Sequence, residues 1–179
     1  MALLAYRSVQ LTLGTRMGEG FSGQDVQKPL NHDKGGHMDT FTALKLKREG
    51  AMKVLEAALQ GAQTTGRSVS VAVVDDGGHL LAFSRTDHAE LYTIPIAIAK
   101  ARGAALTCFP TGKKSPTGNE RSDHQALAIT LAAGTDSFVS IPGGCPITAN
   151  GQVIGAIAVS GAGNKDEEIA KSAAALIGK

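Results

Sequence analysis

An apolar stripe at helical spacing is the first regular pattern in the chain. Between Leu44 and Ala62, apolar residues recur at steps of three and four, which is the spacing of one face of an α-helix. We therefore expect a helix from about Thr40 to Gln63 that ends near Gly66.

Two short strands joined by a tight turn are expected next. Valine and alanine fill most of positions 69–74, and a second apolar run covers 79–84. The sequence Asp-Asp-Gly-Gly lies between them at 75–78, and glycine readily adopts the positive φ that hairpin turns require. The pattern predicts a β-hairpin.

Two helices are expected in the middle of the chain. Thr93 can cap a helix that runs to about Leu106, and the many alanines of this helix indicate close packing against a sheet or another subunit. Ser122 and Gln125 have the S-x-x-Q spacing of a capping box. A short helix should therefore follow Ser122 and end at Gly134.

The last part of the chain has the pattern of three strands and a helix. Apolar segments cover 138–141, 146–149 and 152–160, and the Asn-Gly pair at 150–151 favours a hairpin between the last two. A final helix should follow Asn164 as its cap. The whole order predicts a single α+β domain with a five-stranded, mainly antiparallel sheet flanked by helices.

Residues 1–38 lack the sustained periodicity of the rest. We interpret them as an N-terminal extension. It is partly non-native if the Gly-Gly-His-Met segment that ends at Met38 is a cloning junction. The domain itself is expected to cover residues 39–179.

Composition and charge narrow the possible partners. The chain has 18 Lys and Arg against 16 Asp and Glu, a formal net charge of +2, and only 4% aromatic residues. Binding of nucleic acid needs a basic footprint and stacking aromatics, so we expect no nucleic-acid partner. No apolar run approaches the roughly 18 residues that span a bilayer. The two cysteines form no disulfide framework, which favours a reducing, cytoplasmic setting without a membrane partner.

One polar cluster falls between the second expected strand and the second helix. It consists of Arg85, Asp87, His88 and Glu90. Loop residues held between rigid elements are well placed to bind a ligand, and histidine can transfer protons or ligate iron near neutral pH. The alternative is a solvated loop with a capping carboxylate.

A second polar cluster lies at the head of the third expected helix. Glu120, Arg121 and His124 form it. Glu120 and His124 are four residues apart, so they face the same way if the helix begins by Glu120. A start at Ser122 would leave Glu120 outside the helix.

The diglycine segment Pro142-Gly143-Gly144-Cys145-Pro146 is a third candidate site. Two glycines allow close approach to a ligand and can direct successive N–H groups at an anion. Cys145 could act as a nucleophile or a soft iron ligand, or it could be an inert small apolar residue.

Five motifs in one order resemble those of a known family: VVDDGGHL at 73–80, RTDHA at 85–89, IAIAKAR at 96–102, IPGG at 141–144 and VIGAIAVSG at 153–161. With this combination the chain resembles the GlcG/HbpS-like family, which includes the C-terminal domain of PduO-type corrinoid adenosyltransferases. The resemblance covers about residues 41–178. It implies a profilin-like fold, assembly into homo-oligomers, and haem binding in some members. Family members often have a small residue, commonly glycine, where this chain has His88, and an aromatic residue near the position of His124.

Two functional hypotheses follow. In the first, the protein binds haem or a related tetrapyrrole in a surface or intersubunit groove, with His88 or His124 as axial ligand of the iron. Arg85 or a nearby lysine would pair with a propionate. Haem is the only cofactor expected.

The alternative is a cofactor-independent enzyme that acts on a small anionic metabolite. Arg85 and the Gly143-Gly144 amides would hold the substrate, and a histidine would move a proton with Glu120 or Asp87 orienting it. The ligand-binding set would also include Glu90, Arg121 and Cys145. Both hypotheses place the 85–90 loop and the diglycine segment on opposite sides of one cavity.

Overall fold

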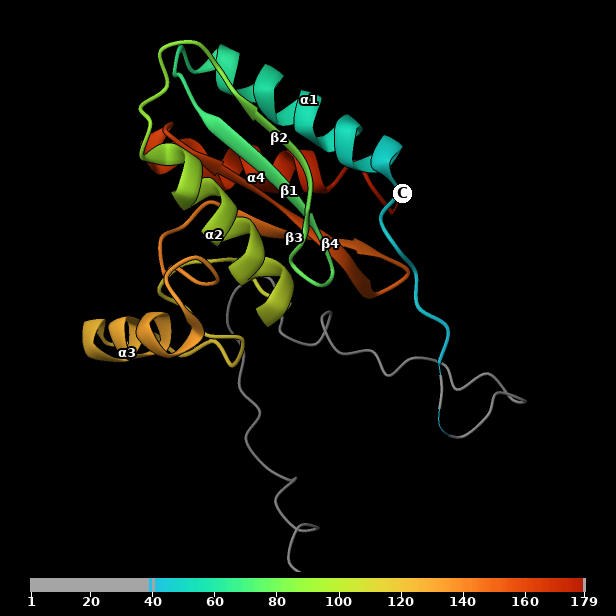
Figure 1. The fold of residues 1–179 in the computed structure, drawn as a ribbon, viewed down its shortest axis with the longest axis vertical. Helices are drawn as coiled ribbons and strands as arrows, with labels where there is room; N and C mark the ends of the chain where they lie inside the picture. Colours follow the sequence, from blue (N-terminus) through green and yellow to red (C-terminus); the bar gives the residue numbers. More distant parts are fainter. Residues whose placement is uncertain (1–38, 40, 179) are drawn as a thin grey trace, which may run out of the picture.

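A four-stranded antiparallel sheet lies at the centre of the computed structural model, which describes residue 39 and residues 41–178 (Figure 1). The strands lie in the order β2-β1-β4-β3, and each neighbouring pair is antiparallel. The expected α+β class with an antiparallel sheet is therefore confirmed. The bounds are Ser70–Asp75 for β1, Leu80–Arg85 for β2, Gly144–Ala149 for β3 and Gln152–Ser160 for β4.

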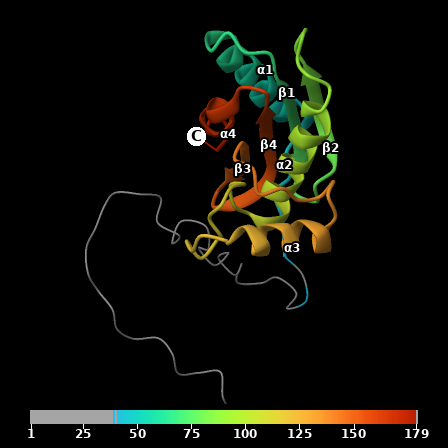
Figure 2. The same ribbon diagram turned by 90° about the vertical axis from the view of Figure 1, so that its left-hand side faces the viewer.

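Helices cover both faces of the sheet. Helices α1 (Arg48–Thr64) and α4 (Asp166–Ala174) pack on one face, and α2 (Thr93–Thr107) packs on the other (Figures 1 and 2). A short 3₁₀ turn, η1 (Gly163–Lys165), leads into α4. Helix α3 (Asp123–Ala133) lies apart from the sheet and contributes no buried residue.

Strand β1 shows why helices are needed on both sides. Val71 and Val73 belong to the core under α1 and α4, whereas Ala72 and Val74 belong to a second core under α2. A strand buried on both faces is apolar at nearly every position. The second core is built mainly from alanines of α2 and β4, so this helix lies close to the sheet, as its composition predicted.

The predicted strand over 138–141 is wrong, and the sheet has four strands rather than five. The backbone N–H groups of Ser137 and Phe138 both donate to the carbonyl of Gly134, which forms a turn after α3. Phe138 is buried next to Gly103 of α2. The buried side chain of Phe138 therefore anchors a turn instead of belonging to a strand. The profilin-like label remains a prediction.

Several helices begin at other residues than predicted. The first helix begins at Arg48 instead of Thr40, because Leu46 reaches the core from an extended segment. Thr93 is the first residue of α2 rather than its cap, and Asn164 lies in η1. Local capping signals locate these helix starts only to within a few residues.

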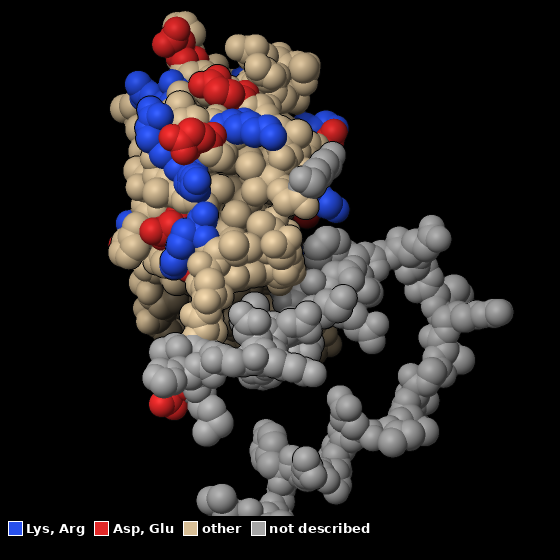
Figure 3. Space-filling model, turned by 90° about the vertical axis from the view of Figure 1, so that its right-hand side faces the viewer, with Lys and Arg blue, Asp and Glu red and all other residues tan. Residues whose placement is uncertain are grey.

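Charges of both signs are interspersed on the face drawn in Figure 3, in keeping with the small net charge. Within residues 39 and 41–178, no helix is long and apolar enough to cross a membrane. The segment 1–38, which we interpret as an extension, lies outside the described residues.

Candidate functional site

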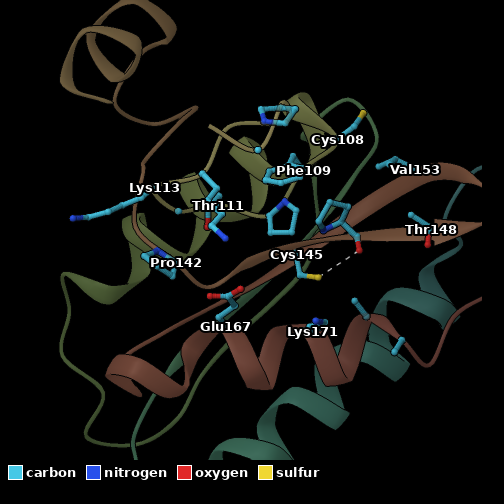
Figure 4. Close-up of a pocket in the computed structure, with 18 of the residues that line it drawn as sticks. Cys108, Phe109, Thr111, Lys113, Pro142, Cys145, Thr148, Val153, Glu167 and Lys171 are labelled. Carbon is cyan, nitrogen blue, oxygen red and sulfur yellow. Dashed lines mark hydrogen bonds between the residues drawn. The ribbon is translucent and has the colours of Figure 1, made fainter. Parts of the chain in front are cut away.

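An open pocket of about 1030 Å³ lies at the outer edge of the sheet, beside β3 (Figure 4). Its walls come from the loop 108–120, the β3–β4 hairpin and α4. Small-molecule sites typically measure about 300–1,000 Å³, so this one has room for a large ligand. We call it the edge pocket; its lining includes Phe109, Pro110, Pro142, Cys145, Val153 and Ile177.

The edge pocket combines apolar walls with charged side chains. Three lysines and two glutamates are part of its lining: Lys113, Lys114, Lys171, Glu120 and Glu167. Figure 4 shows Glu167 and Lys171 on α4 and Lys113 on the opposite, loop side. Such a lining suits a ligand with an apolar body and anionic groups at its periphery.

The loop wall of the pocket is held by Arg121. Its Nη1 donates to the carbonyls of Gly112 (3.3 Å) and Lys114 (2.8 Å), and its guanidinium lies 5.7 Å from the centre of the Phe138 ring. Arg121 itself does not line the edge pocket. The residue predicted to bind ligand therefore supports the wall that the ligand would touch.

The two glycines of the diglycine segment are required by close packing on α2. Gly143 has φ 126°, and a Cβ there would lie 2.7 Å from the Val159 carbonyl and 2.8 Å from Lys100 Nζ. A Cβ on Gly144 would overlap the Lys100 carbonyl. The Gly144 N–H donates to Thr111 Oγ1 at 2.8 Å. This amide is therefore occupied within the protein and does not form the predicted anion site.

A buried ion pair lies next to the diglycine segment, and it was not predicted from the sequence. Lys100 Nζ lies 2.9 Å from Asp166 Oδ2 and donates to the Val159 carbonyl at 3.0 Å. Asp166 Oδ1 accepts from the Ala162 N–H at 2.8 Å. Burial lowers the pKa of Lys100, although the hydrogen bond and charge of Asp166 oppose this shift. The available signal was a lysine inside an alanine-rich helix expected to pack on a sheet.

Cys145 lines the edge pocket but is not an activated nucleophile. Desolvation by burial raises the pKa of its thiol to about 11. Its Sγ donates to the Pro146 carbonyl at 3.7 Å (Figure 4). The thiol therefore stays protonated at neutral pH, and the reactive form of cysteine is the thiolate.

The two predicted site histidines both lie outside the edge pocket. His88 is exposed in the loop before α2 and has φ 66°, a backbone conformation that favours glycine. His124 is exposed in the first turn of α3. No hydrogen bond among the described residues joins either imidazole to Asp87 or Glu120, so the predicted acid–base pairs are not formed within one protomer.

The start of α3 decides where Glu120 lies. The capping box of Ser122 and Gln125 is present as predicted, and the helix begins at Asp123. Glu120 is thus outside the helix and forms an isolated β-bridge with Lys114. It lines the edge pocket, whereas His124 does not.

The remaining predicted residues lie at the end of β2 or just after it, at the edge of the sheet opposite to β3. Arg85, Asp87 and Glu90 are exposed, and Glu90 raises the pKa of Tyr92 through a hydrogen bond and its charge. Strands β1 and β4 separate β2, where this loop begins, from β3, which follows the diglycine bend. No residue of 85–90 lines the edge pocket. The edge pocket is therefore not a cavity between these two elements, and their predicted shared cavity stays a prediction.

Comparison with known proteins gives a consistent family assignment. A family model described as "Haem degrading protein HbpS-like" matches residues 46–175. Protein GlcG of Escherichia coli K12 is 38% identical over 119 residues, which cover 66% of this chain and 84% of GlcG. An uncharacterized 15.0 kDa protein of Citrobacter freundii is 32% identical over 111 residues, covering 62% of this chain and 76% of that protein.

Solved structures share the fold. A double mutant of Streptomyces reticuli HbpS superposes with a TM-score of 0.66 at 32% identity, covering 84% of this chain and 100% of HbpS. The PduOC:haem complex has a TM-score of 0.59 at 23% identity, with 75% of this chain and 96% of PduOC covered. The second likeness, at this identity, concerns the fold alone.

Proposed function

Because the chain belongs to the HbpS-like family, we propose that it binds haem or a related tetrapyrrole, and that the macrocycle lies in the edge pocket. The observation that carries this proposal is the pocket itself, about 1030 Å³ in volume with mainly apolar walls. The fold is compatible with such a ligand, since PduOC has the same fold and its crystal structure is a haem complex.

The chemistry of the lining fits an amphipathic macrocycle. Phe109, Pro110 and Val153 provide apolar surface for the ring, and burial of apolar surface is the main source of affinity in such sites. Lys113 and Lys114 would pair with the propionates by charge-assisted hydrogen bonds. Together these groups would hold and orient the ligand.

The lining does not offer an imidazole to the iron. Cys145 is present, but its thiol is held protonated by burial. An imidazole ligand must therefore come from a residue outside this lining, and His88 and His124 remain the candidates. Bound haem would supply an iron centre whose reactivity depends on that axial ligand and on the polarity of the pocket.

A titration of the full-length protein with hemin tests the proposal. We expect a saturable change in the Soret band at one haem per edge pocket. Thr148 is an exposed residue of β3 in the pocket lining, and Thr148→Trp should fill the space while suiting the strand. We expect this variant to lose at least about tenfold in affinity, equivalent to about 1.4 kcal/mol.

The matched control is Thr135→Trp, an equally large change at an exposed threonine outside the pocket lining. The control should bind hemin as the wild-type protein does. Unchanged binding by Thr148→Trp would show that the edge pocket is not the site. Absence of a saturable Soret change in the wild-type protein would refute haem binding.

A further inference from the structure

Helix α3 is strongly apolar, yet none of its residues is buried. Its sequence, DHQALAITLAA, carries apolar residues around the whole circumference. Helices of this kind are normally buried, and an isolated helix of 11 residues is only marginally stable in water. Figures 1 and 2 show α3 apart from the sheet, beyond one end of α2. Among the described residues of its own protomer, the helix therefore has no surface that covers it.

One exposed stripe of α3 joins an imidazole to large apolar side chains. His124, Leu127, Ala128 and Leu131 are spaced i, i+3, i+4 and i+7, so they share one face of the helix. Leu127 is 60% and Leu131 66% exposed. The two half-buried residues of α3, Ala126 and Thr130, are outside this stripe. We call the four residues the His124 stripe.

The His124 stripe cannot fold back onto the edge pocket of its own protomer without loss of anchoring contacts. Before α3, Arg121 is fixed by two carbonyls of the loop 108–120. After α3, the turn at Gly134 leads to the buried ring of Phe138. Both ends of the helix are therefore held.

In the described part of the chain, the edge pocket lacks an apolar cover and a histidine, and the His124 stripe could supply both. It is an open, apolar groove with lysines in its lining and no histidine among its described lining residues. The stripe supplies apolar cover and an imidazole. Asp123, at the start of the same helix, is its one charged residue and is opposite in sign to a lining in which three lysines outnumber Glu120 and Glu167. One two-fold contact between identical chains would cover both surfaces at once.

We propose that α3 of a second copy of this chain closes the edge pocket, and that His124 of the partner subunit is the axial ligand of the bound haem iron. This inference rests on the proposed haem binding in the edge pocket. The contact is isologous, so each subunit contributes a pocket to one site and a histidine to the other. A complete site then exists only in the assembled protein.

A hybrid of two defective variants tests the shared site. His124→Ala keeps the pocket but lacks the ligand, and Thr148→Trp keeps the ligand but has a filled pocket. We expect neither variant alone to show the spectrum of imidazole-ligated haem. A hybrid dimer, co-expressed with two different affinity tags and purified through both, contains one intact site of two. It should recover about half of the wild-type imidazole-ligated haem.

The outcomes separate this inference from the haem proposal. If His124→Ala alone abolishes imidazole ligation and the hybrid recovers none, the histidine acts within its own subunit and the shared site is refuted. If His124→Ala leaves imidazole ligation unchanged, His124 is not the ligand. If the wild-type protein binds no haem, the proposed function fails, and the assembly test below still decides whether α3 forms the contact.

Sedimentation of the haem-free protein tests the contact directly. Leu127→Glu with Leu131→Glu places two charges on the His124 stripe and should reduce wild-type oligomers to monomers. Gln125→Glu with Ala133→Glu adds the same charge elsewhere on α3 and should sediment as the wild-type protein does. A wild-type monomer, or an unchanged oligomer in the Leu127 and Leu131 variant, would refute the α3 contact.

Discussion

Removal of Asp166 should cost far more stability than removal of a surface carboxylate. The side chains of Lys100 and Asp166 are 1% and 7% exposed, and Nζ lies 2.9 Å from Oδ2. Asp166→Ala would leave the ammonium with the Val159 carbonyl alone and would also leave the Ala162 N–H without its acceptor. Breaking one side of a buried pair costs about 3–5 kcal/mol, a large part of the about 5–15 kcal/mol that stabilises a typical domain.

Urea unfolding at pH 7 measures this cost. The control is Asp136→Ala, which removes the ion pair with Arg102 from a carboxylate that is 77% exposed. We expect the control to lose no more than about 1 kcal/mol. We also expect the double variant Lys100→Met with Asp166→Leu to recover part of the loss. An apolar pair of similar volume leaves no buried charge, but the Ala162 N–H still lacks its acceptor. A loss below about 1 kcal/mol in Asp166→Ala would refute the assigned role of the pair.

The pH dependence gives a second measurement on the same variant. The pKa of Lys100 is lower in the folded protein than its ordinary value of 10.5, so the unfolded chain binds more protons between those two pKa values. Stability should therefore rise with pH across that window and be independent of Lys100 below it. Asp166 opposes the lowering of this pKa. Its removal should lower the pKa further and extend the rise in stability to lower pH; parallel pH curves for wild type and variant would contradict this.

Three further predictions concern single residues. Cys108 is exposed, whereas burial raises the pKa of the Cys145 thiol to about 11, so a thiol reagent at pH 7.5 should modify Cys108 rapidly and Cys145 only after unfolding, as peptide mapping would show. Gly144→Ala should destabilise the protein by about 3 kcal/mol or more in thermal or urea unfolding, because the new methyl group would overlap the Lys100 carbonyl. His88→Gly should stabilise it by about 0.5–1 kcal/mol, since relief of the left-handed backbone at φ 66° outweighs the added flexibility of the unfolded chain; a loss of stability would contradict this account.

The pattern of apolar residues predicted most helices and strands of the fold, because most signals here are local. The two hairpins, the capping box at Ser122 and the alanine-rich packing of α2 were all predicted. The segment 138–141 was wrongly predicted as a strand, because an apolar run alone does not indicate whether it pairs with a strand or anchors a turn. That distinction depends on Phe138 finding a place beside Gly103, a contact between residues 35 positions apart that no local pattern encodes.

The candidate site was harder to predict for the same reason. Cys145 and Glu120, which were predicted as a ligand-binding and a catalytic residue, both line the edge pocket, and their roles stay predictions. Residue type could not show that the N–H of Gly144 is used by Thr111, or that Arg121 holds a loop. Polar and glycine-rich motifs indicate that a backbone position is constrained, and only tertiary contacts show whether a ligand or the protein imposes the constraint.

The packing of the sheet explains why the pocket lies at an edge. Between α2 and the sheet, alanines from both sides bring the backbones too close together for a cavity. On the opposite face, α1 and α4 fill the space with valine, leucine and isoleucine.

Room remains beside β3, next to which the described residues form no further strand, and Pro146 of β3 offers no backbone N–H. Exposed sheet edges are normally covered or blocked, since they invite pairing with other chains. A bound macrocycle closed by α3 of another subunit would cover this edge and the exposed leucines of α3 in one step. The absence of a further described strand beside β3 thus accounts for the space of the edge pocket, and it leaves an edge that the proposed second subunit would cover.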